Sequence, residues 1–107
     1  MEKVLVLLST FNGEKYLEAQ IQSLLAQDYQ NLGILIRDDG STDGTKLILQ
    51  NFEKQFPKRI QVEYGKNVGY RNSFFRLMET VPTDCSFYAF CDQDDYWLPQ
   101  KISKAIS

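Results

Sequence analysis

Three aspartates stand close together near the end of the chain, at positions 92, 94 and 95. They follow the aromatic segment 87–91, which has the composition of a strand. If that strand continues, the i, i+2 spacing points the carboxylates of Asp92 and Asp94 to one side and directs Asp95 away. Such a pair suits Mg²⁺ or Mn²⁺, which complete their coordination with water and substrate phosphates. The spacing predicts a divalent-cation site at Asp92 and Asp94; the alternative is a polar turn that caps the next helix.

A second acidic pair, Asp38 and Asp39, opens a stretch of turn-forming residues at 38–45. A carboxylate at this point can accept hydrogen bonds from a nucleobase imide or from ribose hydroxyls. Gly40 would let the backbone approach such a ligand closely. The alternative is a solvated loop in which Asp43 caps the following helix.

Two further loops carry polar groups. Segment 9–12 is Ser-Thr-Phe-Asn, in which Phe11 could pack against a base. Segment 66–71 contains Lys66 and Arg71, and thus two cations. Either loop could meet a diphosphate. For each loop alone, the alternative is an ordinary polar surface loop.

The elements that must position these loops alternate between strand and helix patterns. Apolar runs predict strands, and apolar residues at helical spacing lie between them. The expected strands are Val4–Leu8, Leu32–Arg37, Ile60–Tyr64 and Phe87–Cys91, and a last helix is expected to carry Pro99 in its first turn. This order predicts one α/β domain over residues 1–107, a mostly parallel sheet with helices on both faces. Ligands bind beyond the carboxyl ends of such strands, where the polar loops gather.

Composition excludes several classes of function. A formal net charge of -2 without a basic run argues against nucleic acid or an anionic membrane surface as the main partner. No apolar stretch approaches a membrane span, and the N-terminus lacks a signal-peptide pattern, so the cytoplasm is the expected compartment. The chain has no histidine, which excludes His-ligated zinc and Ser-His or Cys-His nucleophile systems within it. Cys85 and Cys91 flank a predicted strand too far apart for a disulfide and are expected to be reduced.

Taken in order, these segments resemble the N-terminal half of family 2 glycosyltransferases of the GT-A fold, over essentially the whole chain. The opening strand and loop are similar to the family's, although Ser9 or Thr10 stands where a proline is often found. Segments 37–45 and 67–74 resemble two further family motifs, and 92–95 resembles the Asp-x-Asp metal motif. The sequence of segment 91–97, together with Pro99 and Lys101, most resembles that of bacterial rhamnosyltransferase-type members.

This resemblance implies a metal-dependent hexosyltransferase of bacterial cell-surface polysaccharide synthesis. Its donor would be a UDP- or dTDP-sugar, and its acceptor a saccharide or a lipid-linked saccharide. The implied nucleotide-binding residues are Ser9, Thr10, Phe11, Glu14, Asp39, Arg71 and Asp92. Within this set Asp39 would contact the base, Arg71 a phosphate, and Asp92 the ribose or the metal. Asp94 would hold Mg²⁺ or Mn²⁺ against the diphosphate.

In this family the carboxylate that activates the acceptor lies beyond the Asp-x-Asp motif. No catalytic base is therefore expected within the chain, and the base is expected downstream of Ser107. Segment 101–107 is helical in character without a stop signal, which predicts a piece of a longer enzyme that binds donor but transfers no sugar. Parts of such a parent protein could place it at the inner membrane face.

Two other functions compete with this interpretation. One is a non-catalytic nucleotide-sugar-binding module, because the same fold can serve different functions. The other is a phosphoacceptor receiver domain, which is also a parallel α/β fold with bound Mg²⁺. A receiver should carry its acidic pair after the first strand, whereas here the first carboxylate after that strand is Glu14.

Overall fold

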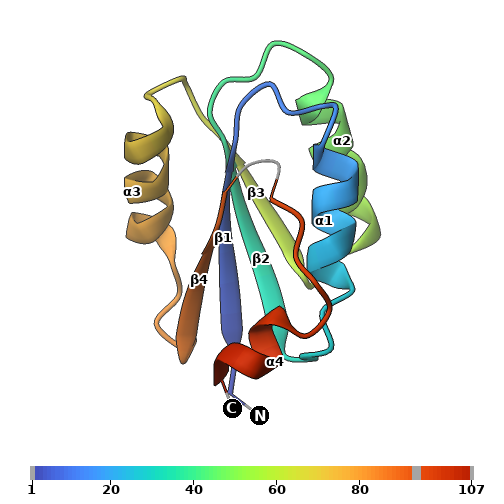
Figure 1. Ribbon diagram of the computed structural model, residues 1–107. Helices are drawn as coiled ribbons and strands as arrows, with labels where there is room; N and C mark the ends of the chain where they lie inside the picture. The colour runs from blue at the N-terminus through green and yellow to red at the C-terminus, as the bar shows by residue number, and fades with distance from the viewer. Residues whose placement is uncertain (1, 93–94, 107) are drawn as a thin grey trace.

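The computed structural model describes residues 2–92 and 95–106. Strands and helices alternate along the chain (Figure 1). The elements are β1 (Val4–Thr10), α1 (Leu17–Leu25), β2 (Leu32–Asp38), α2 (Thr45–Gln55), β3 (Ile60–Tyr64), α3 (Tyr70–Thr80), β4 (Phe87–Cys91) and α4 (Lys101–Ile106). All strand pairs are parallel, in the order β3-β2-β1-β4. The predicted parallel α/β architecture is confirmed.

Helices cover both faces of this sheet, with α1 and α2 on one face and α3 on the other (Figure 1). The alternation of side chains along β1 explains the two layers. Val4, Val6 and Leu8 belong to the core beneath α1 and α2, whereas Leu5 and Leu7 pack toward α3. Every residue of β1 is buried, as expected of a central strand covered on both sides.

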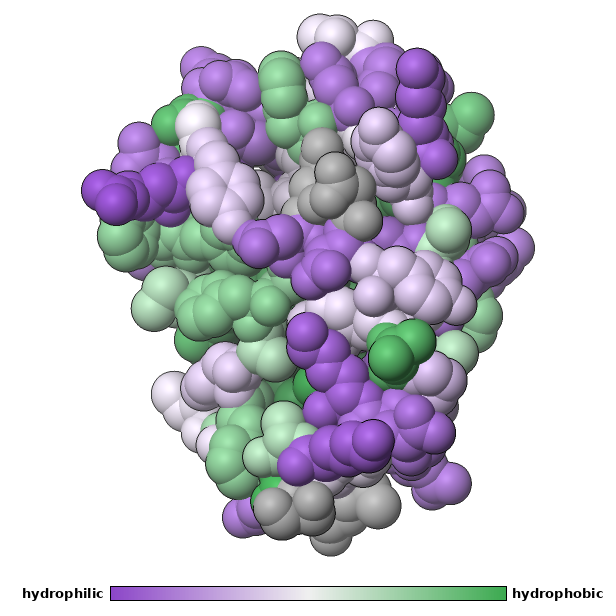
Figure 2. Space-filling model, in the orientation of Figure 1, coloured by the Kyte–Doolittle hydropathy of each residue, from purple (hydrophilic) through white to green (hydrophobic). Residues whose placement is uncertain are grey.

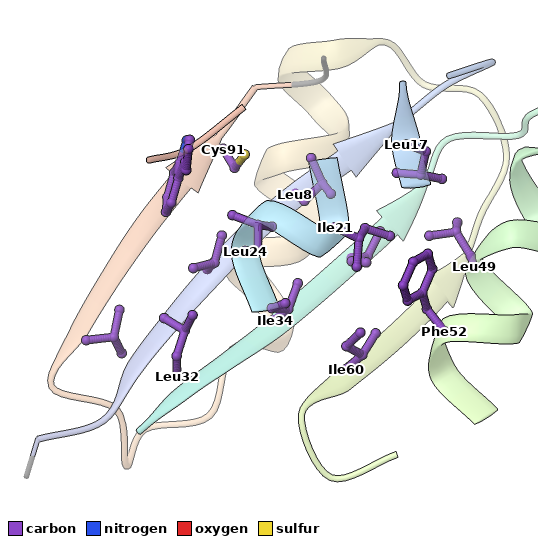
Figure 3. Packing of buried hydrophobic residues seen from close by; sticks show 14 of the residues in the cluster. Leu8, Leu17, Ile21, Leu24, Leu32, Ile34, Leu49, Phe52, Ile60 and Cys91 are labelled. Carbon is purple, nitrogen blue, oxygen red and sulfur yellow. The ribbon is translucent and has the colours of Figure 1, made fainter. Parts of the chain in front are cut away.

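The larger core lies between the sheet and α1 and α2 (Figure 3). Leu17, Ile21 and Leu24 form the apolar stripe of α1 and face the strands in the close-up. Leu49 and Phe52 of α2 extend this core toward β3. Full burial of each such side chain stabilises the fold by about 1.5–3 kcal/mol. These contacts hold the strand ends, and thus the loops beyond them, in fixed positions.

The segment before α4 differs from expectation. Pro99 lies two residues ahead of Lys101, the first residue of α4, and not in the first helical turn. The chain is instead docked on the end of α1, because the Leu98 carbonyl accepts from Gln27 Nε2 at 2.8 Å and the Pro99 carbonyl accepts from the Asp28 amide at 2.8 Å. Because of these tertiary hydrogen bonds, the helix begins two residues later than the position of Pro99 predicts.

Strand β4 ends the described sheet on the side opposite β3. Apolar side chains gather over β4 and the adjoining part of α3 on the face shown in Figure 2. The exposed apolar residues of these two elements include Phe75, Met78, Phe87 and Phe90. None of the described helices combines the length and apolarity needed to cross a bilayer. Cys85 and Cys91 are both free thiols, as predicted.

Candidate functional site

Polar loops meet beyond the carboxyl ends of β1 and β2, at the top of the view in Figure 1. The Asn12 amide donates to Ser41 Oγ at 2.9 Å, and the Thr42 amide donates to Asn12 Oδ1 at 2.8 Å. Asn12 has a positive φ of 49°, a conformation that asparagine tolerates better than most residues. The Gly13 amide donates to Thr45 Oγ1 at 2.9 Å. The first two polar loops predicted from the sequence are therefore one hydrogen-bonded unit.

Asp38 anchors this unit from inside the protein. It is fully buried, and it pairs in register with Thr10 of β1. Its Oδ1 accepts from Thr10 Oγ1 at 2.8 Å and from Ser41 Oγ at 2.6 Å, and its Oδ2 accepts from the Ser41 amide at 2.9 Å. Both carboxylate oxygens are thus used within the protein, and the role of Asp38 is to fix the turn after β2.

Asp39 ties the same turn to the loop before α3. The residue is only 2% exposed. Its Oδ1 accepts from Arg37 Nη1 at 2.7 Å and from the Val68 amide at 2.9 Å, while Oδ2 accepts from the Gly69 amide at 3.0 Å. Gly69 has a φ of 92°, in the region that favours glycine, so the backbone can present its amide here. Asp39 therefore brings the third loop to the same edge.

A pocket of about 340 Å³ opens between these loops. Ser9, Thr10, Phe11, Asp39, Asn67, Gly69 and Tyr70 line it. Phe11 is 43% exposed and Tyr70 is 59% exposed, so both rings are available to a ligand. The pocket therefore combines two aromatic surfaces with a buried carboxylate and small polar groups, which suits a flat polar ring such as a nucleobase.

Four of the predicted site residues, Ser9, Thr10, Phe11 and Asp39, meet in this pocket. Glu14 and Arg71 are not among the described residues that line it. Glu14 instead accepts a hydrogen bond from the Gly44 amide at 3.0 Å. Tyr70 was not singled out from the sequence. Its position next to Gly69, at the start of a helix that follows an edge loop, is the signal that could have identified it.

Asp92 reaches this pocket through Tyr70, whose hydroxyl donates to Asp92 Oδ1. This hydrogen bond, followed by burial and the charge of Asp92, raises the pKa of Tyr70 above its ordinary value. The Asp92 carbonyl accepts from Gln20 Nε2 of α1 at 2.5 Å, which fixes the backbone just after β4. Asp92 is not among the described residues that line the pocket, but its exposed carboxylate lies at the rim through this hydrogen bond with Tyr70.

The predicted partner of Asp92 as a metal ligand, Asp94, lies outside the described residues. Asp95 is held elsewhere, since its Oδ2 accepts from the Trp97 indole at 3.2 Å. Within residues 2–92 and 95–106, no group of three potential metal-ligating side chains is found. The exposed Asp92 carboxylate is a hard oxygen donor of the kind that Mg²⁺ and Mn²⁺ prefer, and one protein carboxylate can suffice when phosphates and water complete the site. The described donor thus fits such a cation.

Cys91, the last residue of β4, lies beside this edge but is unsuited to chemistry. Burial raises the pKa of its thiol to about 12. The thiolate, which is the nucleophilic and metal-binding form, is therefore negligible at neutral pH.

Comparison with known proteins places this site in context. The profile of the family described as "Glycosyl transferase family 2" matches residues 5–107. The chain is 35% identical over 102 residues to the dTDP-rhamnosyl transferase RfbG of Shigella flexneri, covering 92% of this chain and 35% of that protein. It is 34% identical over 107 residues to the UDP-Glc:alpha-D-GlcNAc-diphosphoundecaprenol beta-1,3-glucosyltransferase WfaP of Escherichia coli, covering 99% of this chain and 41% of that protein.

The chain is also similar in structure to solved glycosyltransferases. S. aureus TarS 1-349 in complex with UDP superposes with a TM-score of 0.84 at 26% identity, covering 97% of this chain and 31% of the TarS 1-349 chain. The mannosyltransferase PcManGT from Pyrobaculum calidifontis, in complex with GDP-Man and Mn2+, gives a TM-score of 0.79 at 20% identity, covering 90% of this chain and 28% of that one, which shows a shared fold. The chain spans about a third of the length of the curated relatives it matches.

Proposed function

The chain belongs to glycosyl transferase family 2, and on that premise we propose that it is the donor-binding part of an enzyme that transfers a sugar from a nucleoside-diphosphate sugar. The acceptor would be a saccharide or a lipid-linked saccharide of the bacterial cell surface. The observation that carries the proposal is the pocket in which Phe11, Asp39 and Tyr70 converge at the carboxyl edge of the sheet. Relatives named for dTDP-rhamnose and UDP-glucose transfer support a UDP- or dTDP-sugar as donor.

The residues that line the pocket would contact the base in different ways. The rings of Phe11 and Tyr70 would pack against the base, because both residues are exposed and both line the pocket. Asp39 would accept the imide N–H of uracil or thymine. Among the described residues, Oδ2 receives one hydrogen bond, from the Gly69 amide, whereas Oδ1 receives two. Oδ2 therefore retains the greater capacity to accept a further donor.

The diphosphate would lie toward the rim that Asp92 forms. Asp92 and Asp94 would hold Mg²⁺ or Mn²⁺, which when bound would neutralise charge on the diphosphate. Tyr70 connects this rim to the base pocket, because its ring lines the pocket and its hydroxyl donates to Asp92. The same residue would therefore contact the nucleoside and orient the carboxylate beside the phosphates.

Metal dependence is the first expected result. UDP should bind several-fold more weakly in EDTA than in Mg²⁺, because the exposed Asp92 carboxylate and the diphosphate are both anionic and repel each other. Titration calorimetry under the two conditions measures the difference. Uridine is the matched control, since it lacks the diphosphate and should bind equally in both. Equal UDP affinity in EDTA and in Mg²⁺ would remove the metal from the proposal and leave the base pocket intact.

Asp39→Asn should weaken UDP binding about tenfold to a hundredfold, the worth of a hydrogen bond to a charged group. Arg37 would hold the amide oxygen of the substituted side chain, so its NH₂ group would face the pocket and oppose the imide N–H. Asp43→Asn, in the same turn but outside the pocket lining, is the control. If Asp39→Asn melts like wild type and binds UDP just as tightly, Asp39 is a turn residue and does not contact the base.

A further inference from the structure

Arg37 is a buried cation for which the proposed donor site has no direct use. Its side chain is 7% exposed and pairs with the 2% exposed side chain of Asp39, with 2.7 Å between Nη1 and Oδ1. Arg37 is not among the described residues that line the pocket. Burying an arginine is costly unless its charge is paired and its N–H groups are satisfied. The hydrogen-bond partners of this guanidinium therefore indicate what it does in the fold.

The guanidinium joins three parts of the fold. Nη1 also donates to Ser73 Oγ of α3 at 3.0 Å, and Nη2 donates to the Lys66 carbonyl in the loop before α3 at 3.1 Å. Ser73 in turn accepts from Ser9 Oγ at the end of β1, at 2.6 Å. Arg37 is thus held by α3 and by the loop before α3 while it binds one oxygen of Asp39, and Ser73 connects it to the end of β1.

Gly65 shows how closely the surrounding residues pack around the Arg37 guanidinium. A Cβ added at Gly65 would lie 2.1 Å from Arg37 Nη2 and 2.7 Å from Cζ, well inside contact distance. Any larger residue at this position would displace the guanidinium. The observed position of the Arg37 guanidinium is therefore compatible only with glycine at position 65.

We propose that Arg37 is a positioning residue that fixes the orientation of the Asp39 carboxylate and thereby sets the preference of the pocket for bases with an imide N–H. The inference rests on the proposed function, in which Asp39 accepts a hydrogen bond from the base. Arg37 and the Val68 amide together fix Oδ1, so the carboxylate cannot rotate about its terminal torsion and Oδ2 stays toward Gly69. Without Arg37 the carboxylate could turn and accept from other donors.

The test compares UDP with CDP, whose base presents an acceptor where uracil has its imide N–H. Wild-type protein should prefer UDP by at least about tenfold, the worth of one charge-assisted hydrogen bond. In Arg37→Met the ratio of the CDP to the UDP dissociation constant should fall to about one. Arg59→Met is the matched control, because Arg59 lies at the other end of the strands beside Leu32 and should leave the ratio unchanged.

Gly65→Ala provides a second variant that keeps both charges and moves only the guanidinium. It should also lower the ratio of the CDP to the UDP dissociation constant toward one, and it decides the question if Arg37→Met fails to fold. Gly33→Ala is its control, since a Cβ there would meet Leu5 at 3.4 Å, an ordinary contact.

If the role of Arg37 is purely structural, its loss should weaken UDP and CDP binding equally. An unchanged ratio of the two dissociation constants in folded variants would therefore overturn the inference. The proposed function would stand in that case, provided that the wild type prefers UDP. Absence of any UDP preference in the wild type would instead overturn the proposed function, and the inference with it.

Discussion

Asp38→Ala should lower the free energy of unfolding by about 3–5 kcal/mol. Three hydrogen bonds to a charged group are lost, each worth about 1.5–3 kcal/mol, and this loss is offset in part because the variant no longer buries a carboxylate. The Thr10 hydroxyl and both donors of Ser41 would lose their acceptor at a site that water does not reach. Denaturant unfolding, with the slope checked for constancy, measures the change.

The matched control for this variant is Asp43→Ala in the same turn. Asp43 is only partly buried, and it accepts from the Thr45 amide at 2.9 Å at the start of α2. Its loss should cost about 1 kcal/mol, as for a helix-terminal hydrogen bond. If Asp38→Ala lowers the free energy of unfolding by no more than Asp43→Ala does, Asp38 does not anchor the turn. The assignment of a structural role to Asp38 and a binding role to Asp39 is then wrong.

The second large effect concerns catalysis: the chain alone should bind donor but transfer no sugar. Activating an acceptor hydroxyl requires a positioned base. Three described acidic side chains at this edge are already engaged, since Asp38 and Asp39 are buried and hydrogen-bonded, and Asp92 accepts from Tyr70. A carboxylate that also neutralises a metal is a poor base.

Transfer is measured by incubating the chain with radiolabelled UDP-sugar and lipid-linked saccharide. WfaP, a relative of which this chain spans 41%, serves as the positive control with the donor and acceptor in its name. The control should label its acceptor, whereas the chain should leave it unlabelled. Acceptor-dependent turnover by the chain at a comparable rate would contradict the prediction. Slow hydrolysis of the donor would not, because water can replace the acceptor.

Much of the fold follows from local patterns in the sequence. The apolar run at 4–8 and the alternation of strand and helix predict the parallel sheet that the structure confirms. The strands reach further than apolarity indicates, because Thr10 and Asp38 are register partners that hydrogen-bond across β1 and β2. Polar residues can thus extend a strand when they satisfy each other, which hydropathy alone does not reveal.

The convergence of residues in the candidate pocket was predictable where it depends on topology and unpredictable where it depends on packing. Ser9, Thr10, Phe11 and Asp39 meet because carboxyl ends of parallel strands share one edge. Arg37 gave no such signal, since its partners come from a loop and a helix that reach it only in the folded protein.

The most direct test of the central claim is to map by NMR which backbone amides shift when UDP and Mg²⁺ are added. Binding at the proposed site predicts saturable shifts at 10–12, 39–40 and 67–70, around the pocket. A second hollow of about 260 Å³, at the opposite ends of the strands, is lined by Lys3, Lys58 and Arg59 and could attract a diphosphate by charge alone. Saturable shifts confined to the first set would support a donor site at the carboxyl edge of the sheet. Shifts confined to 30–33 and 58–59, or no saturable shifts, would contradict it.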